Sequence, residues 1–247
     1  MRKAIVSGAN GFVGSAVVKE LISQGYEVYA LVRENHYDQV PINEMVRIVP
    51  FSLENIEALG EVIPINEYEA FYHFAWNGSA GVDRADTALQ LKNAQWTVEC
   101  LQMAKRLGCK RFVPAGSIME HETIAAVYTQ GNRPGAGYIY GSGKVAAHMM
   151  CMSMAVKEGI NLVWPKITNA YGPSERSPRL VNSTIRKCIA GEDPQFTAGT
   201  QNYDFVYIDD VARAFRLIGE KGKPFHHYLI GSGKAKALKE FLLEMRA

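Results

Sequence analysis

The sequence predicts an α/β fold built on a doubly wound parallel sheet. Short, continuously apolar runs alternate with longer stretches in which apolar residues recur at helical spacing. Strands that are apolar along their whole length are covered on both faces, and helices between them make the connections parallel. A glycine-rich segment at 8–14, directly after the first apolar run, is typical of the first strand-to-helix turn of such a sheet.

The elements follow from the same alternation, taken in chain order. The strands are expected at 3–7, 27–32, 46–49, 70–75, 111–115 and 161–164. The first helix is expected at 12–23, where Gly25 ends it, and a longer one at about 87–107, where Gly108 ends it. A third helix is expected at about 140–157, and a last helical pattern covers 238–245.

The composition changes after residue 170, where glycine, proline, serine and arginine become dense at 171–178. We therefore expect a nucleotide-binding domain over 1–170 and a small substrate-binding lobe over 171–247 that is interleaved with it.

The bulk properties exclude several classes of protein. The net charge of +2 is too small to indicate a nucleic-acid or membrane partner. No apolar run approaches the roughly 20 residues that span a bilayer, and no secretory signal precedes the first strand. The four cysteines lack CxxC spacing, so they predict packed thiols in a reducing compartment and no metal site. A cytoplasmic protein is expected.

The glycine-rich segment predicts a Rossmann-type dinucleotide site. Glycines allow a sharp turn and a close approach of the backbone to a pyrophosphate, and the following helix offers free N–H groups and a partial positive charge. The strand before the segment and the helix after it supply the required context. The residues expected to contact the cofactor here are Gly8, Asn10, Gly11, Phe12, Val13 and Gly14.

Arg33, at the end of the second expected strand, bears on the choice of cofactor. An acidic residue at this distance from the glycines would bind the ribose hydroxyls of NAD, whereas an arginine can grip a 2′-phosphate. We therefore favour NADP over NAD. Glu34 beside it keeps NAD open, and Arg33 could instead be a solvated surface charge.

Tyr140 and Lys144 form a YxxxK pair, which on a helix lies on one face. A lysine ammonium near a phenol stabilises the phenolate, so that Tyr140 can exchange a proton with a carbonyl or alcohol oxygen while hydride moves to or from a nicotinamide. Ser117 follows the fifth expected strand, at the sheet edge where ligands bind, and could donate a hydrogen bond to the same oxygen. Its alternative role is a helix cap or turn.

Taken together, these motifs resemble the extended short-chain dehydrogenase/reductases that act on nucleotide sugars. The matching segments span nearly the whole chain and lie at 8–14, 73–76, 110–117, 140–144, 169–173 and 204–211. The resemblance implies a catalytic set of Ser117, Tyr140 and Lys144, in which the lysine also holds the nicotinamide ribose. It further implies cofactor contacts from Phe74, Ala75, Pro165 and Ile167, and substrate contacts from Trp76, Ser117, Ile118, Asn169 and Arg179.

Some matches leave alternatives open. Asn93 corresponds to a family asparagine that often supports the site, although it could be an amide on the helix surface. His73 is expected to be a packed strand residue. Arg176, Arg179 and Arg186 are candidates for binding a diphosphate, and each could equally be a surface charge.

The resemblance also narrows the reaction. Dehydratases of the family carry an Asp-Glu pair immediately after the catalytic Ser or Thr, whereas here that pair is missing and Glu120 is one acid, offset by two positions. Dehydration is therefore not expected. Segments 73–76, 116–120 and 196–204 look most like 4-ketoreductases of nucleotide-linked deoxyhexoses, which we prefer. The alternatives are a 4-epimerase with tightly bound NAD and a cofactor-sensing regulator that lacks activity.

The chain departs from the family at several places. Lys166 and Tyr203 stand where relatives commonly have arginine, and Ser52 stands where an aspartate often binds the adenine amine. The sequence ends where relatives usually continue, so it is expected to be naturally short or to lack a C-terminal piece. The family also implies a homodimer, in which the methionine-rich run at 148–154 would serve the interface or, alternatively, the core.

Overall fold

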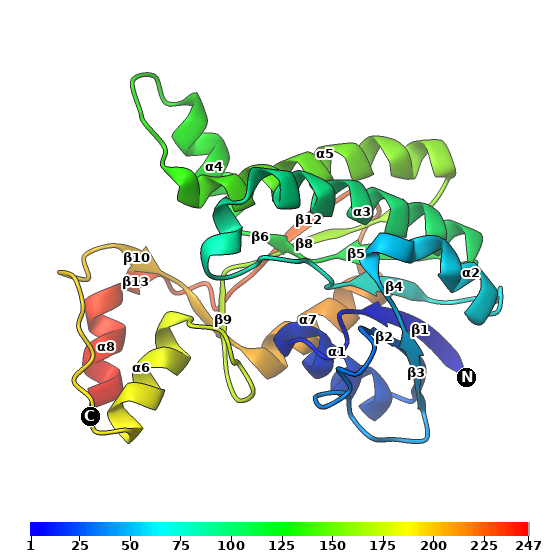
Figure 1. Ribbon diagram of the computed structural model, residues 1–247, viewed down its shortest axis with the longest axis horizontal. Coiled ribbons are helices and arrows are strands. Elements are labelled where there is room, and N and C mark those ends of the chain that lie inside the picture. The colour runs from blue at the N-terminus through cyan, green and yellow to red at the C-terminus, as the bar shows by residue number, and fades with distance from the viewer. Residues whose placement is uncertain (247) are drawn as a thin grey trace.

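The computed structural model describes residues 1–246 and is built on a six-stranded parallel sheet with helices on both faces (Figure 1). The strand order is β3-β2-β1-β4-β5-β7, so the order reverses between β1 and β4. A crevice at the carboxyl ends of these two strands is where such sheets bind ligands. The strands are β1 (Arg2–Ser7), β2 (Tyr26–Val32), β3 (Val46–Pro50), β4 (Ala70–His73), β5 (Arg111–Pro114) and β7 (Asn161–Leu162). The predicted fold class is confirmed.

Two helical layers cover the sheet (Figure 1). On one face lie α1 (Phe12–Ser23) and α7 (Ile208–Lys221), whose apolar side chains form one core cluster with β1 and β2. On the other face lie α3 (Thr87–Arg106) and α5 (Ile139–Glu158), with η1 (Leu53–Ala58) and α2 (Leu59–Val62) beside them. Asp86 caps α3 by accepting the Leu89 N–H at 3.0 Å, and Gly159 ends α5 in the left-handed conformation.

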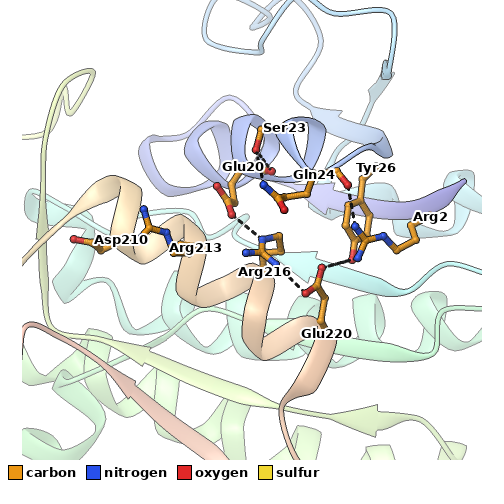
Figure 2. A network of polar contacts seen from close by, with 9 residues as sticks. All are labelled: Arg2, Glu20, Ser23, Gln24, Tyr26, Asp210, Arg213, Arg216 and Glu220. Carbon is orange, nitrogen blue, oxygen red and sulfur yellow. Dashed lines mark hydrogen bonds and ion pairs between the residues drawn. The ribbon is translucent and has the colours of Figure 1, made fainter.

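A partly buried charge network fastens α7 to the first elements of the chain (Figure 2). Arg216 of α7 binds Glu20 of α1 at 2.7 Å and Glu220 at 2.8 Å. Glu220 in turn accepts from Arg2 at 2.8 Å and from the Tyr26 hydroxyl at 2.9 Å. The guanidinium of Arg216 therefore sits between two carboxylates that come from helices far apart in the sequence.

The strand expected at 161–164 is in fact divided between two sheets. The Val163 N–H still donates to the Phe112 carbonyl of β5 at 3.1 Å, but the Trp164 N–H donates to the His226 carbonyl at 3.0 Å. Trp164 thus begins a separate strand, β8 (Trp164–Ile167), which pairs with β12 (His227–Ile230) and with β6 (Gly116–Ser117). The prediction of one continuous strand was wrong, because the chain changes its hydrogen-bonding partner at Val163.

Other boundaries differ by one or two residues or were not foreseen. The strands β4 and β5 end before residues 74 and 115, which lie outside regular secondary structure. The helices at 12–23, about 87–107 and about 140–157 are found, and α8 (Leu238–Arg246) matches the last helical pattern. The helices that the sequence did not indicate are η1, α2, η2 (Val82–Ala85), α4 (Met119–Tyr128), η3 (Ala136–Tyr138), α6 (Leu180–Ile189) and α7. The short strands β6 and β12, and the other strands after residue 168, were not indicated either.

The part of the chain after residue 171 contributes to two regions. At one end of the molecule, α6, α8 and the antiparallel pair β10 (Asn202–Tyr203) and β13 (Lys236–Ala237) gather in a lobe (Figure 1). By contrast, β11 (Phe205–Tyr207) pairs with β9 (Asn169–Tyr171), while α7 and β12 return to the main body. The division into domains at residue 170 remains a prediction.

Two further expectations concern surfaces. Within residues 1–246, no helix combines the length and apolar character that crossing a bilayer requires. Cys100, Cys109 and Cys151 are buried, but Cys188 is exposed near the end of α6. The prediction of packed thiols is therefore wrong for Cys188, because α6 buries only Thr184 among its ten residues.

Candidate active site

The glycine loop between β1 and α1 is built so that a ligand can approach its backbone. Gly8 has a φ of 66°, and a Cβ there would lie 2.8 Å from the Ala75 nitrogen. A Cβ on Gly14 would lie 2.1 Å from the Gly8 carbonyl oxygen. No side chain caps the start of α1, whose N-cap is Gly11, so N–H groups of its first turn are free for an anion. The loop therefore fits the pyrophosphate of a dinucleotide.

A cavity of about 510 Å³ extends from this loop to the start of α5, so the loop and the YxxxK pair share one space. Many of the residues expected from the sequence line it: Gly8, Asn10, Gly11, Phe12, Val13, Gly14, Arg33, Phe74, Ala75, Trp76, Ser117, Tyr140, Lys144, Ile167 and Arg179. Four expected residues lie outside the cavity wall, namely Asn93, Ile118, Pro165 and Asn169.

These four residues differ in how they relate to the cavity wall. Asn93 is buried, not on the helix surface, and its amide binds the backbone N–H and carbonyl of Asn77 at 2.9 and 2.8 Å. The Ile118 N–H donates to the Ile167 carbonyl, and the Asn169 amide donates to the Asp204 carbonyl at 3.3 Å. Pro165 is buried in β8. Asn93 thus fixes the segment after β4 and does not reach the cavity itself.

The other two candidate arginines for a diphosphate also lie outside the cavity wall. Arg176 pairs with the exposed Asp38 at 2.7 Å, and Arg186 donates to the Glu175 carbonyl at 2.9 Å. Arg179 lines the cavity and lies 3.4 Å from the buried carboxylate of Glu175.

Lys144 is 6% exposed and is held at the edge of the sheet. Its Nζ donates to the Ala115 carbonyl at 2.9 Å and lies 3.5 Å from the centroid of the Trp76 ring, a favourable cation–π contact. Burial lowers the pKa of Lys144 to about 7, because the cation is removed from water. The charge of this lysine is therefore sensitive to pH in the neutral range.

Tyr140 lies one helical turn before Lys144 on α5 and is 8% exposed. Burial raises the pKa of its phenol, while the nearby charges of Arg179 and Arg84 and the neighbouring Ser117 hydroxyl act in the opposite direction. The Arg84 guanidinium lies 4.2 Å from the ring centroid, and the Trp76 ring meets Tyr140 edge to face at 6.0 Å. Burial outweighs these neighbours, so the pKa of Tyr140 lies above its usual value and the phenol is protonated at neutral pH.

Ser117 stands at the end of the short strand β6. Its Oγ accepts the Met119 N–H at 3.2 Å, so its own hydrogen is free to be donated elsewhere. The predicted turn role and the predicted site role are both compatible with this contact, since Ser117 also lines the cavity.

Sequence reasoning missed two residues around the site. Gln90 is buried in α3, accepts the Trp76 indole N–H at 2.8 Å, and donates to the carbonyls of Gly78 and Asp83. Arg84, in the segment that Gln90 holds, carries the guanidinium over Tyr140. An uncharged amide at an inward position of α3 was the available signal for Gln90, whereas nothing local in the sequence marks Arg84.

His73 is a packed strand residue, as expected. It is buried in β4, and its ring nitrogens face the hydroxyls of Ser7 at 2.7 Å and Thr97 at 3.4 Å. Burial lowers the pKa of His73 to about 3, so it stays neutral at physiological pH. No group of three or more His, Cys, Asp or Glu within residues 1–246 is placed to hold a metal ion.

A dinucleotide loop that opens into the same cavity as a serine, a tyrosine and a lysine defines an oxidoreductase of the short-chain dehydrogenase/reductase type. Residues 4–231 match the family model described as NAD dependent epimerase/dehydratase family. The chain belongs to this family, and the resemblance stated from its motifs is confirmed. It is an enzyme of the extended short-chain dehydrogenase/reductase group.

Several characterised proteins are similar along most of the chain. CDP-abequose synthase of Salmonella muenchen is 27% identical over 255 residues, which cover 97% of this chain and 78% of that protein. The dTDP-6-deoxy-L-talose 4-dehydrogenase (NAD(+)) of Aggregatibacter actinomycetemcomitans is also 27% identical, over 97% of this chain and 89% of its own length. The dTDP-glucose 4,6-dehydratase of Escherichia coli is 24% identical, over 93% and 71%.

Among solved structures, the UDP-glucose 4-epimerase of Thermotoga maritima, determined with UDP-glucose, superposes with a TM-score of 0.82. It is 23% identical, and the match covers 99% of this chain and 81% of that one. The similarity establishes the shared fold.

Proposed function

We propose that this enzyme reduces the 4-keto group of a nucleotide-linked deoxyhexose. The observation that carries the proposal is the single cavity in which Ser117, Tyr140 and Lys144 open onto the glycine loop. A bound nicotinamide cofactor would supply the hydride. Tyr140 would donate the proton to the carbonyl oxygen, Ser117 would donate a hydrogen bond to the same atom, and Lys144 would stabilise the phenolate that forms.

Two arguments favour reduction over dehydration. Removing water across a sugar ring needs an acid and a base beside the catalytic serine, but the Glu120 side chain is 1% exposed and bonds to the Trp164 indole at 3.0 Å, outside the cavity wall. In addition, a similar protein at 27% identity is named as a 4-dehydrogenase of a dTDP-linked deoxyhexose, whereas the similar 4,6-dehydratase is 24% identical.

The test is turnover of a 4-keto-6-deoxyhexose nucleotide with NADPH, compared between the wild type and Tyr140→Phe. Loss of the phenol should reduce kcat by at least about a hundredfold, the lower range of general-acid contributions. Unchanged turnover in the variant would refute the role of Tyr140. Stoichiometric NAD released from the denatured wild-type protein would instead support the 4-epimerase alternative and overturn the reductase.

For the cofactor we propose a preference for NADPH. Arg33 follows β2 and lines the cavity, where its guanidinium could pair with a 2′-phosphate. Arg33→Ala should weaken NADPH by at least about tenfold, on the scale of a hydrogen bond to a charged group, and NADH by less than about twofold. Isothermal titration with both cofactors makes the comparison. Equal losses would refute the 2′-phosphate role and leave NAD as the cofactor.

We also propose a homodimer formed through α3 and α5. Met149 and Met150 of α5 are exposed, together with Leu91 of α3, whereas Met152 and Met154 pack against the core. The methionine-rich run at 148–154 thus has some side chains at the surface and others packed against the core. Light scattering should give twice the chain mass for the wild type and the single-chain mass for Met149→Lys.

A further inference from the structure

A buried carboxylate lies directly behind Ser117, on the side away from the cavity. Glu120 is the second residue of α4, and its side chain reaches back to β6 and across to β8 and α5. In the sequence, Glu120 stands two positions beyond the place where dehydratases of the family carry their Asp-Glu pair. In the fold, its side chain contacts three other elements.

Each oxygen of Glu120 has two polar neighbours. Oε1 accepts the backbone N–H of Ser117 at 2.9 Å and the indole N–H of Trp164 at 3.0 Å. Oε2 lies 2.9 Å from His148 Nδ1 and 3.3 Å from Lys166 Nζ. The His148 ring stacks on Trp164 with centroids 4.3 Å apart and an interplanar angle of 4°. The carboxylate is therefore fixed in position from β6, β8 and α5 at once.

The carboxylate takes the place of a neighbouring strand. In the sheet β12-β8-β6, β6 is an edge strand of only two residues, and its other side pairs with β8. The Ser117 N–H points to the open edge, where Glu120 accepts it. Gly116 makes the approach possible, because a Cβ there would lie 2.5 Å from Trp164 Nε1 and 2.7 Å from Glu120 Oε1.

The charges around Glu120 keep it ionised. Burial by itself would raise the pKa of Glu120, but hydrogen bonds from His148, Trp164 and the Ser117 N–H hold that pKa below its usual range. Lys166 supplies the compensating positive charge, and its other neighbour is His121 Nε2 at 3.5 Å. The hydrogen bond to Ser117 is consequently charge-assisted, which makes it shorter and stronger than a neutral one.

We propose that Glu120 is a positioning residue that fixes Ser117 for catalysis, with His148 and Lys166 holding the carboxylate in place. With its N–H bound to Glu120 and its Oγ accepting the Met119 N–H, Ser117 is held in the cavity wall while its hydroxyl hydrogen stays free to be donated to a ligand. This role rests on the proposed function only in that Ser117 donates to the reacting oxygen.

The test is a double-mutant cycle of Glu120→Gln and Ser117→Ala, which isolates what Glu120 does through Ser117. Glu120→Gln keeps the volume but places an amide NH₂ against Lys166 or His148. We expect kcat to fall about tenfold with KM changed less than about twofold, since the loss is of transition-state positioning. In the Ser117→Ala background the same change should cost less than about twofold. The matched control is Glu122→Gln, an exposed glutamate on the same helix.

Multiplicative losses in the cycle would show that Glu120 acts independently of Ser117 and would overturn the proposal. If the wild type does not reduce a 4-keto sugar, the reductase assignment fails, and the cycle is repeated for oxidation of a 4-hydroxyl with NAD, where Ser117 would contact the same oxygen. A readout that needs no substrate accompanies both. Exchange of the Ser117 amide hydrogen should be about fivefold faster in Glu120→Gln than in Glu122→Gln, and equal rates would refute the contact.

Discussion

Replacing Arg84 by glutamine should change the acidity of Tyr140 without touching the catalytic set itself. The guanidinium lies 4.2 Å from the centre of the phenol ring and is fixed by a hydrogen bond to the Ser79 carbonyl at 2.9 Å. Opposite unit charges about 5 Å apart attract by about 3 kcal/mol at an effective dielectric constant of about 20. Arg84 is partly exposed, so solvent screening reduces this to about 1 kcal/mol.

An energy of about 1 kcal/mol corresponds to about 0.7 pKa unit, so Arg84→Gln should raise the pKa of Tyr140 by that amount. In ketoreduction the protonated phenol is the active form. The alkaline limb of the pH profile of kcat should therefore move about 0.7 unit to higher pH, while kcat at neutral pH falls about twofold because the phenol is a weaker acid.

The assay is kcat from pH 6 to about 11 at saturating substrate and NADPH, in a Lys144→Arg background so that the loss of the lysine charge near pH 7 does not mask the titration of the phenol. Arg133→Gln removes the same charge from an exposed loop position and should leave the limb in place. Arg84→Lys keeps a cation near the phenol, so its alkaline limb should be displaced less than that of Arg84→Gln. An unmoved limb, or one displaced to lower pH, would refute the electrostatic role of Arg84.

Three further changes test the site and the fold. Burial lowers the pKa of Lys144 to about 7, so kcat/KM should decline as pH rises through that value and the ammonium loses its charge. The variant Lys144→Arg stays charged and should show no such decline near pH 7. Arg216→Ala leaves the partly buried carboxylate of Glu20 without its ion-pair partner and removes one of the partners of Glu220, so it should lower the free energy of unfolding by about 2 kcal/mol and the Tm by about 4–8 °C. The control is Arg213→Ala in the same helix (Figure 2), which breaks an exposed pair with Asp210 and should cost less than about 0.5 kcal/mol. Equal Tm values for the two variants would contradict this. Gly14→Ala brings a Cβ to 2.1 Å from the Gly8 carbonyl oxygen and should abolish measurable cofactor binding. In Gly25→Ala the new Cβ has no neighbouring atom within 4 Å, so this variant should lose about 1 kcal/mol of stability and keep its cofactor affinity in a titration.

The elements that sequence analysis found are those whose signal is local. The strands β1 and β2 are predominantly apolar because most of their residues are buried, and α1 is bounded by glycines on both sides. The helix α4 gives no such signal. Its buried residues are Glu120 and Thr123, while Ile124, Val127 and Tyr128 are exposed, so its apolar residues do not mark the side that packs.

The residues of the site likewise fall into two groups, those with a local signal in the sequence and those without one. The glycine loop and the pair of Tyr140 and Lys144 are spacings within a few residues, which a single sequence reveals. Arg84 and Gln90 acquire their roles only when the segment after β4 folds back over α5, and Glu120 only when β6, β8 and α5 meet. These arrangements depend on contacts between residues that are far apart in the chain.

Because the hydrogen-bonding partner of the chain changes at Val163, the parts of the polypeptide before and after residue 171 depend on each other. β8 gains β12 as a neighbour, and α7 covers the sheet face opposite α5, although both elements come after residue 171. If the polypeptide were cut in the loop near residue 175, the N-terminal fragment would lack β12 and α7. The edge of β8 would then have no partner strand, and the core that Phe215 of α7 covers would be exposed. Neither piece should bind a dinucleotide by itself. Expressed together, they should reassemble by fragment complementation, with the strand β12 acting as the connecting element between the two halves.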